Sequence, residues 1–472
     1  MDWKPTKQPH RTYHAQIVDW FTTRIANGDF PSGMQCPPQR TLAVQFGVNR
    51  STINTAMDEL KANGLLETRV GAGTFVAENP WPHLLTQPKW QQYIHASIHK
   101  PNIDTVQRIN EYEQRPNIIR LGTGELAPSL LPVDALADSF QQVTLTAQML
   151  GYSEPKGSFA LRTALCEHVK KRGIDTTPAN ICIVSGALQA FQLVALGLLQ
   201  PGSVVFQQRA SYLNSIHPFQ SAGMQMLDVT EQEPLRDELE RKKRQRNAIF
   251  YAMPTLDNPT GANWSHMKKQ ETYEVCKALS IPIVEDDVYG ELLFDENAHP
   301  MKTMDTTGHV LYVGSVSKTM SPGLRIGWII GPETVIQRLA DIKMQTDYGS
   351  SALSQAVVTH WLTTGLYEAH VSVLKDALQQ RARQMEQLLQ RYFHDIATWQ
   401  PAKGSFYIWL RLHEPRMTKA LFLQLLSHNI LVNPGYLYEP NDFHHIRLSY
   451  AYASLDDMTT GLAQLAALLK QA

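Results

Sequence analysis

The sequence of 472 residues has only four cysteines, almost no net charge and no long apolar run. The cysteines form no CxxC pair and no Cys/His cluster at ligand spacing, so the pattern predicts neither a disulfide framework nor a metal site. A formal net charge of -1 argues against a surface coated with nucleic acid, although a local patch needs only its own positive charge. The most apolar stretch, residues 191–199, is about half as long as a membrane span, and residues 1–10 lack the apolar core of a signal peptide. We therefore expect a cytoplasmic protein that does not enter the membrane.

The length and the patterning of the chain predict more than one domain. A hydrophobic fraction of 43% and a charged fraction of 18% are typical of globular proteins rather than disordered ones. The pattern of residues 1–77 predicts three helices followed by a short glycine-containing hairpin. Residues 78–117 contain several prolines among polar residues and are expected to form a linker, with room for short helices. We expect residues 118–472 to form one larger domain.

Short apolar runs alternate with amphipathic helical stretches in this larger region. The alternation predicts an α/β fold with a mostly parallel central sheet that helices cover on both faces. From about residue 352 the pattern is mainly helical, with one β-like run at 405–412, which predicts a small C-terminal α+β domain. The predicted core strands lie at 181–186, 203–206, 248–254, 281–287 and 310–318.

A basic run at 241–246 has two interpretations. It is either a nucleic-acid patch or the solvated end of a helix, where cations suit the negative end of the helix dipole. The run falls between a helical stretch and the predicted strand at 248–254, so we favour the helix end.

The segment 39–60 has the pattern of a helix-turn-helix. An apolar stripe in the first helix is followed by Gly47, which permits a tight turn, and by Asn49, which is suited to cap the second helix. The exposed start of a recognition helix enters the major groove, where its side chains reach phosphates and base edges. The side chains expected at this start are Asn49, Arg50, Ser51, Thr52 and Asn54.

Two β-like segments follow and flank Gly71-Ala72-Gly73, where the glycines permit a hairpin whose backbone approaches a phosphate closely. Arg69 and Thr74 would flank this contact. A helix-turn-helix pattern alone recurs in many folds, but a wing directly behind it makes the combination specific.

Residues 10–77 as a whole resemble the GntR class of winged helix-turn-helix domains. The stretches that carry the resemblance are PPQRTLAVQFGVNRSTI and GLLETRVGAGTFV. Eight Lys and Arg against six Asp and Glu in residues 1–77 leave a local charge of +2, which agrees weakly with DNA binding. The DNA contacts that the resemblance implies are Arg40, Arg50, Ser51, Thr52 and Gly73.

The larger region carries residue types that match the demands of pyridoxal 5′-phosphate (PLP). This cofactor needs an amine to form an imine, an acid at its pyridine nitrogen and donors for its phosphate. Lys318 follows an apolar strand, where a lysine on its own is usually a solvated loop residue. Ser315 and Ser317 add hydroxyl donors, and Arg325 adds a forked cation suited to a phosphate. The segment 315–328 resembles the lysine segment of fold-type I PLP enzymes, which implies that PLP is attached to Lys318 as an aldimine.

Two acids end the predicted strand at 281–287. Strand alternation directs Asp286 and Asp287 to opposite faces, so only one should meet the pyridine nitrogen; we favour Asp286, with Asp287 as the alternative. By the same resemblance, Tyr289 and Asn258 would donate hydrogen bonds to the phenolic oxygen of the ring. The bond from Asn258 to the following proline is a candidate cis peptide. The predicted catalytic residues are Lys318, Asp286 and Tyr289.

Further cofactor and effector contacts are expected around these residues. The turn Ser185-Gly186-Ala187-Leu188 would present backbone N–H groups and a positive helix end to the phosphate, and Tyr212 would stack on the ring. The resemblance also implies that Tyr152, in a YxxPxG segment, reaches the phosphate of the partner subunit in a dimer. Arg447 would bind an α-carboxylate in a bidentate pair, with Gly124 in the same site. Taken alone, Arg447 is as readily interpreted as an arginine on a surface strand.

A GntR-type domain joined to a fold-type I aminotransferase-like domain resembles the MocR/GabR family of regulators. The resemblance implies a head-to-tail homodimer that binds a double-stranded DNA operator and senses an amine, an amino acid or PLP itself by exchange at Lys318. That ligand must bind one conformation better than another, and a shift of the small domain is the expected response. The alternative is a working aminotransferase with an accessory DNA-binding domain. We favour the regulator because an enzyme alone needs no DNA-binding domain, while residual transaminase activity stays compatible with the residue set.

Overall fold

A computed structural model describes residues 3–8, 11–26, 29–69, 71–77, 103–230, 232–294 and 298–471. The chain divides into two compact units, Met1–Ser97 and Ile98–Ala472, and each is described by itself. Residues 78–102 of the predicted linker lie outside the described residues. No helix in the described part of the chain is both long and apolar enough to cross a membrane.

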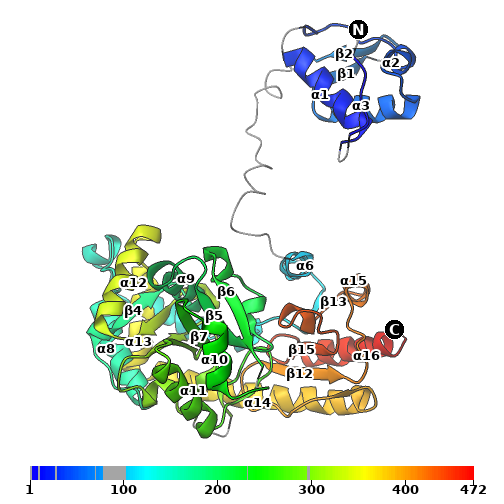
Figure 1. Ribbon diagram of the computed structural model, residues 1–472. Coiled ribbons are helices and arrows are strands. Elements are labelled where there is room, and N and C mark those ends of the chain that lie inside the picture. Colours follow the sequence, from blue (N-terminus) through cyan, green and yellow to red (C-terminus); the bar gives the residue numbers. More distant parts are fainter. Residues whose placement is uncertain are drawn as a thin grey trace. The chain divides into compact units, whose positions relative to one another are not determined.

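The described part of the first unit contains the predicted three helices and antiparallel hairpin (Figure 1). Helix α2 ends because Gly47 adopts a left-handed conformation with φ of 67°. Helix α3 begins where the side chain of Asn49 accepts a hydrogen bond from the backbone N–H of Thr52. The core of the unit includes the buried residues Leu42, Phe46, Ile53, Ala56, Met57 and Leu60. The elements are α1 (Tyr13–Ala26), α2 (Gln39–Phe46), α3 (Arg50–Ala62), β1 (Leu66–Arg69) and β2 (Gly73–Val76).

The second unit is built around a seven-stranded sheet, counted within its described residues, with the order β4-β10-β9-β8-β7-β5-β6. Strand β10 runs antiparallel to both of its neighbours, and the other neighbouring strands are parallel. The predicted mostly parallel sheet is therefore confirmed. The strands are β4 (Ile181–Val184), β5 (Val204–Gln208), β6 (Gln225–Val229), β7 (Ala248–Ala252), β8 (Ile283–Asp286), β9 (Val310–Ser315) and β10 (Gly327–Ile330).

Helices cover both faces of this sheet, which explains the apolar runs in its central strands. In β4, Cys182 and Val184 pack on one side, whereas Ile181 and Ile183 pack on the other. The first face is covered by α9 (Ala187–Leu198) and α12 (Glu333–Thr346). The opposite face is covered by α8 (Phe159–Lys170), α10 (Leu235–Lys243), α11 (His266–Ala278) and α13 (Ala352–Thr364), and α7 (Val133–Gln142) packs against α13.

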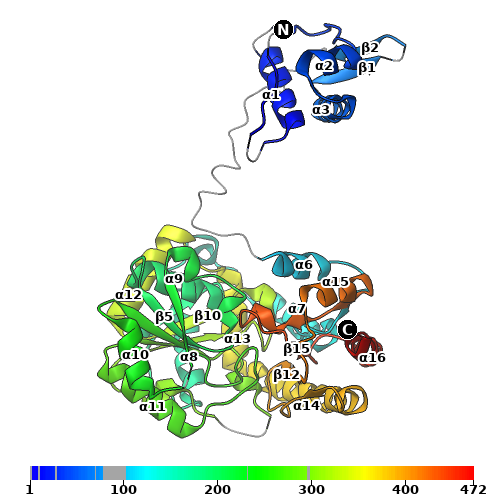
Figure 2. The same cartoon turned by 45° about the vertical axis from the view of Figure 1, so that its right-hand side comes forward.

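The C-terminal part of the second unit forms the expected smaller α+β subdomain. The long helix α14 (Leu366–Phe393) leads into it and packs beside α16 (Leu455–Gln471) (Figure 2). The predicted strand at 405–412 is β12, the second strand of an antiparallel sheet with the order β11-β12-β15-β14. The remaining elements are β3 (Ile119–Arg120), β11 (Ala397–Thr398), β12 (Tyr407–Leu412), α15 (Lys419–Ser427), β13 (Ile430–Leu431), β14 (Asn433–Pro434) and β15 (His445–Ser449).

The helix α6 (Asp104–Tyr112) lies within the stretch predicted as linker, but it is a packed part of the second unit. Ile109 is buried in the core of the smaller subdomain, with Val106 and Tyr112 packed against the same core. The spacing of these three side chains places them on one face of a helix, which is the physical reason why this stretch packs. The compact region therefore begins before the predicted boundary at residue 118.

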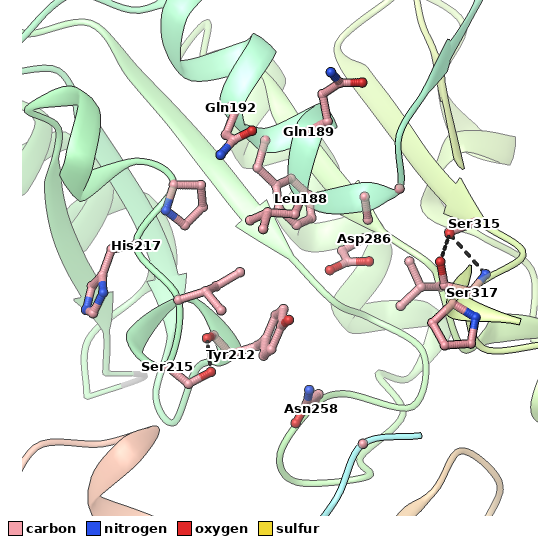
Figure 3. Close-up of a pocket in the computed structure, with 18 of the residues that line it drawn as sticks. Leu188, Gln189, Gln192, Tyr212, Ser215, His217, Asn258, Asp286, Ser315 and Ser317 are labelled. Carbon is pink, nitrogen blue, oxygen red and sulfur yellow. Dashed lines mark hydrogen bonds between the residues drawn. The ribbon is translucent and has the colours of Figure 1, made fainter. Parts of the chain in front are cut away.

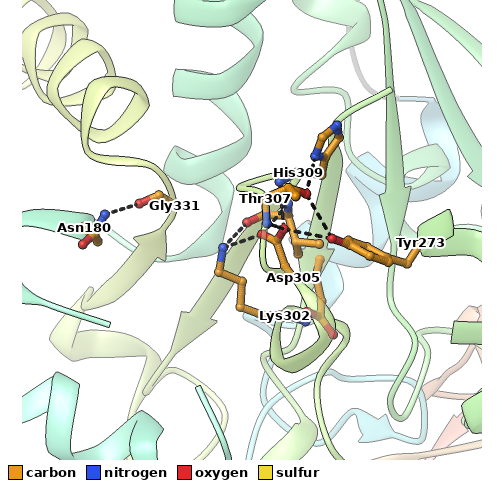
Figure 4. Close-up of polar contacts among 9 residues, drawn as sticks. Asn180, Tyr273, Lys302, Asp305, Thr307, His309 and Gly331 are labelled. Carbon is orange, nitrogen blue, oxygen red and sulfur yellow. Dashed lines mark hydrogen bonds and ion pairs between the residues drawn. The ribbon is translucent and has the colours of Figure 1, made fainter. Parts of the chain in front are cut away.

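The loop before β9 is fixed by the carboxylate of Asp305 (Figure 4). Its two oxygens accept hydrogen bonds from the backbone N–H groups of His309 and Val310, each at 3.0 Å, and Lys302 Nζ lies at 2.8 Å. Burial opposes ionisation of this carboxyl, but the hydrogen bonds from Lys302 and the backbone outweigh it and lower the pKa of Asp305 to about 2. The start of the strand that leads to Lys318 is thereby anchored.

The basic run at 241–246 is the end of α10, as the sequence favours. Arg241 pairs with Glu233, and Lys242 lies 2.5 Å from Glu238. Lys243 donates to the backbone carbonyl of Leu279 at 2.8 Å. These local contacts account for three of the cations without a nucleic acid.

Candidate functional site

A cavity of about 1050 Å³ lies between the sheet and the smaller subdomain of the second unit. It opens at the carboxyl ends of the parallel strands, where ligands bind in open α/β sheets. Figure 3 shows Tyr212, Asn258 and Asp286 facing this space from three different segments, with Leu188 on α9 above them. The predicted site residues that line it are Gly124, Gly186, Ala187, Leu188, Tyr212, Asn258, Asp286, Tyr289, Ser315, Ser317, Lys318, Arg325 and Arg447.

Lys318 reaches the cavity from the turn that follows β9. Its Nζ donates a hydrogen bond to the backbone carbonyl of Gly124 at 2.7 Å. The ring centroids of Tyr289 and Phe406 lie 5.6 and 5.7 Å from the same nitrogen. The amine is therefore half-buried in an aromatic corner, and its one described hydrogen bond is to a neutral carbonyl that another ligand can replace.

The two acids at the end of β8 point to opposite faces, as strand alternation predicts. Asp286 lines the cavity and accepts a hydrogen bond from the hydroxyl of Tyr251 at 2.8 Å. Burial raises the pKa of Asp286 to about 7. Asp287 lies instead in an ion pair with Arg172 at 2.5 Å and accepts a hydrogen bond from Tyr312. Of the two acids, only Asp286 lines the cavity.

The turn after β4 forms one end of the cavity. Arg325 donates to the backbone carbonyl of Ser185 at 2.6 Å, and its guanidinium lies beside Gly186. Gly186 has a φ of 87°, a backbone conformation that favours glycine, and a Cβ atom there would come within 2.8 Å of Arg325 Nη2. Helix α9 begins at the next residue, Ala187, and the positive end of its dipole at this point favours an anion.

The serines near this end are partly engaged with each other. The hydroxyl of Ser315 lies 2.9 Å from Ser317 Oγ and 2.9 Å from the backbone carbonyl of Ile326. Ser185 Oγ lies 3.2 Å from Ser350 Oγ and is absent from the cavity lining, although the Ser185 backbone begins the turn. Among the serines predicted to contact the cofactor, Ser315 and Ser317 therefore border the cavity.

Arg447 is buried in β15, which excludes a surface arginine. It donates to Asn258 Oδ1 at 2.8 Å and to the backbone carbonyl of Gly122 at 2.7 Å, and its guanidinium lies 4.0 Å from the ring centroid of Tyr407. Both hydrogen-bond acceptors are neutral, so the charge of Arg447 lacks a carboxylate partner among the described residues. The peptide bond between Asn258 and Pro259 is cis.

Tyr152 does not line the cavity. It is 84% exposed, and its ring packs against Tyr348 with centroids 5.0 Å apart. Its predicted contact would be made across a dimer, so a single chain leaves this prediction untested.

Three contributions to the cavity are missing from the sequence prediction. Tyr251 holds Asp286, and the hydroxyl of Tyr407 lies 2.9 Å from that of Tyr289. Both tyrosines belong to strands that the sequence identifies, and strand alternation was the signal that could have assigned them a face. The third contribution comes from α6 and its C-cap, which line the cavity with Val106, Ile109, Asn110 and Glu113. The sequence prediction treats this stretch as a linker, so it gives no indication that the helix lies at the cavity.

The predicted DNA-binding residues lie at the surface of the first unit. The Asn49 side chain accepts hydrogen bonds from the hydroxyls of Ser51 and Thr52 at 2.8 and 2.6 Å, which organises the start of α3. On the hairpin, Arg69 pairs with Glu67 at 2.7 Å. Thr52 and Thr74 are half-buried, and the exposed residues are Arg40, Asn49, Arg50, Ser51, Asn54, Arg69, Gly71 and Gly73.

A winged helix-turn-helix joined to an aminotransferase fold defines a class of DNA-binding transcriptional regulators. Residues 116–465 match the family model described as aminotransferase class I and II, and residues 14–76 match that of bacterial regulatory proteins, gntR family. The fold of the second unit is thus that of PLP-dependent aminotransferases, and the first unit is a DNA-binding domain.

Relatives with the same two parts cover nearly the whole chain. The uncharacterized HTH-type transcriptional regulator YisV of Bacillus subtilis is 45% identical over 470 residues, which are 98% of this chain and 96% of YisV. The HTH-type transcriptional regulator NorG of Staphylococcus aureus is 34% identical over 443 residues, which are 93% of this chain and 100% of NorG. The chain belongs to the HTH-type transcriptional regulators of the MocR type, in which a GntR domain is fused to an aminotransferase class I and II domain. The predicted regulator is confirmed.

Solved aminotransferases share the fold of the second unit. The multiple substrate aminotransferase of Thermococcus profundus aligns with a TM-score of 0.74 at 23% identity and covers 81% of this chain and 99% of its own. LysN of Thermus thermophilus, an α-aminoadipate aminotransferase, aligns with a TM-score of 0.71 at 25% identity over 81% of this chain and 99% of its own. These likenesses describe the architecture.

Proposed function

We propose that this regulator binds PLP in the cavity of its second unit and senses an amine or amino acid there. The observation that carries the proposal is the convergence of Lys318, Asp286 and Arg447 on one cavity from three different elements. PLP and an amino acid together require an amine, an acid and a cation for a carboxylate, and each of these residues supplies one of them.

The cavity residues fit the cofactor. The Oδ1 atom of Asp286 is buried without a hydrogen-bond partner among the described residues, and a protonated pyridine nitrogen would satisfy it. At the opposite end, Arg325 and the N–H groups after Gly186 would hold the phosphate, and Tyr212 would cover one face of the ring. Arg447 already occupies the Oδ1 atom of Asn258, which leaves the amide N–H₂ of Asn258 to donate to the phenolic oxygen.

Bound PLP supplies an aldehyde that condenses with primary amines. Lys318 would provide the resident amine, and Asp286 would keep the ring nitrogen protonated. An amino-acid effector would lay its carboxylate against Arg447, whose present partners are neutral oxygens that a carboxylate can displace.

Two hydrogen bonds suggest how occupancy of the cavity changes the unit. Lys318 donates to the carbonyl of Gly124, and Arg447 donates to the carbonyl of Gly122. Both cations are therefore hydrogen-bonded to the short segment 122–124. Attachment of the lysine to PLP and capture of a carboxylate by Arg447 would each remove one of these bonds. The segment is further joined to α6 by the hydrogen bond from Thr123 to Glu113. An effector that removes the hydrogen bonds to Gly122 and Gly124 would favour a conformation that differs from the conformation of the ligand-free unit. A ligand must bind one conformation better than another for a switch to operate.

Visible absorbance and DNA binding test this proposal together. The full chain saturated with PLP should absorb in the visible range, Lys318→Ala should not, and an active amino compound should change both the spectrum and the affinity for the DNA upstream of the protein's own gene. That affinity should fall steeply with salt, since phosphate contacts dominate it. A protein that is colourless after incubation with PLP and removal of the unbound cofactor would refute cofactor binding.

Transaminase activity is the second candidate function, because the residues expected of an amino-transfer site, Lys318, Asp286, Tyr289, Asn258 and Arg447, share one cavity. A single-turnover reaction with candidate amino acids separates the two functions. Release of the matching oxo acid would indicate transfer of the amino group, whereas a stable spectral change without oxo acid would indicate sensing alone.

We further propose a homodimer that acts in the cytoplasm, where it meets its operator. Exposed apolar side chains recur within residues 145–159 of the second unit, and Tyr348 packs against one of them, Tyr152; exposed apolar residues are common on association surfaces. They include Leu145, Leu150, Tyr152, Phe159 and Tyr348. Sedimentation velocity of the full chain should give twice the mass of one chain, and Tyr152→Ala should weaken PLP binding if the partner's phosphate contact is made.

A further inference from the structure

One carboxylate in the cavity has no role in the chemistry described so far. Glu113 lines the cavity and is half-buried at the C-terminal end of α6. Its Oε1 atom accepts a hydrogen bond from the hydroxyl of the buried Thr123 at 2.8 Å. Because Thr123 lies between the two residues whose carbonyls bind Arg447 and Lys318, this contact directs Glu113 toward the effector end of the cavity rather than the phosphate end.

The charge of Glu113 is not matched by a cation of the chain in the described residues. Nearby arginines are engaged with other acids, since Arg108 pairs with Asp104 and Arg115 pairs with Glu111. The other acid of the cavity mouth, Asp347, accepts hydrogen bonds from Gln189 and from a backbone N–H. Glu113 therefore has a single neutral hydroxyl as its described partner, and unlike Asp286, which has a similar single hydroxyl partner at the end of β8, it lies on α6 beside the segment that binds Arg447.

The local position of Glu113 is also unfavourable for an acid. It is the C-cap residue of α6, and its backbone N–H donates to the carbonyl of Ile109. The negative end of the helix dipole disfavours a carboxylate there and favours a cation. Residues that break such a local rule tend to belong to functional sites.

We infer that Glu113 selects the effector by binding a cationic group on its side chain. This inference rests on the proposed function, because it assumes an amino acid whose carboxylate lies at Arg447. The Glu113 carboxylate and the carbonyl end of α6 together attract an ammonium group, and Asn110, one turn earlier and also lining the cavity, adds an amide. The effector class is thus an amino acid with a second amino group, rather than an apolar or acidic one.

The test compares three probes of similar length on the full chain loaded with PLP: L-lysine, L-norleucine and L-2-aminoadipate. Titration of the visible spectrum gives an apparent Kd for each probe. We expect L-lysine to bind roughly 10- to 100-fold more tightly than L-norleucine, as for a hydrogen bond between charged groups, and L-2-aminoadipate to bind most weakly. Glu113→Gln should reduce the preference for lysine over norleucine, the ratio of their two Kd values, to about one.

Two further variants make the result specific. Glu111→Gln removes an acid from the same helix that does not line the cavity, and it should keep the preference for lysine. Glu113→Asp keeps the charge on a shorter side chain, and it should retain part of the preference. A preference for lysine that survives Glu113→Gln, or equal Kd values for all three probes in the natural chain, would overturn the inference alone. A spectrum that no amino compound changes would refute the proposed sensing function itself.

Discussion

Replacing Asp286 by asparagine is expected to alter how the stability of the cofactor-free protein depends on pH. Burial raises the pKa of Asp286 to about 7 in the folded chain, whereas an aspartate in the unfolded chain titrates near ~3.9. The folded state therefore retains this proton more strongly than the unfolded state does. The raised pKa therefore stabilises the folded state at low pH. This stabilisation is lost progressively as the pH rises from the unfolded pKa through the folded pKa, and above the folded pKa stability no longer changes with pH through this group.

The size of the effect follows from these two pKa values. Between pH 5 and pH 8 the linkage amounts to about 2.5 kcal/mol in the free energy of unfolding. The second unit, Ile98–Ala472, holds about 375 residues, and unfolding entropy is about 2.1 cal/mol/K per residue. The expected change in Tm is thus about 3 °C.

Thermal unfolding of both proteins without PLP at pH 5, 6.5 and 8 checks this value. The Tm of the Asp286→Asn variant relative to the natural chain should rise by about 3 °C from pH 5 to pH 8. Other buried acids whose pKa is raised, such as Glu285 and Asp257, contribute to both proteins and cancel in the difference. Asp138→Asn, at an exposed position of α7, is the matched control for the charge change. A difference in Tm that is constant with pH, or that falls, would refute the assignment of a raised pKa to Asp286.

Three other changes have expected outcomes. Arg50→Ala should weaken DNA binding and reduce its salt dependence, measured by fluorescence anisotropy, without altering the visible spectrum of the PLP-loaded chain; bleaching would contradict the division of roles. Gly186→Ala should raise the Kd for PLP by about tenfold or more, because the new methyl group would meet Arg325, and an unchanged Kd would place the phosphate elsewhere. Asp305→Asn should lower the free energy of unfolding by about 1 to 2 kcal/mol at pH 7, measured by denaturant titration. The loss should vanish as the pH falls through about 2, the folded pKa of Asp305, and a loss that persisted in acid would contradict the reasoning.

The sequence predicts those parts of the fold that depend on local patterns. Strands β4, β5, β7, β8 and β9 each carry an apolar run and are buried along nearly their whole length because helices cover both sheet faces, and all five are found where expected. The edge strand β6 and the short strand β10 are missed. Strand β6 has exposed and half-buried residues, so it lacks a continuous apolar run, and β10 follows the PGLR turn so closely that its four residues form no separate pattern.

The cavity residues, too, are predictable from the sequence only where a local pattern places them. Asp286 and Asp287 can be assigned to opposite faces from strand alternation, and the structure separates them in this way. The hydrogen bonds that join Lys318 to Gly124 and Arg447 to Gly122 link residues far apart in the chain, which no local pattern specifies. The role of α6 in the cavity is missed because its neighbouring prolines and polar residues are typical of a linker.

The opposite placement of Asp286 and Asp287 has a consequence for how related proteins can diverge. Asp287 is buried against Arg172, and its loss would strand a buried guanidinium at a cost of about 3 to 5 kcal/mol, whether or not the chain uses a cofactor. Asp286 faces a cavity and is held by a single tyrosine, so its replacement removes no ion pair. Loss of the cofactor would therefore remove the reason for an acid at position 286, whereas the ion pair at position 287 would still stabilise the fold.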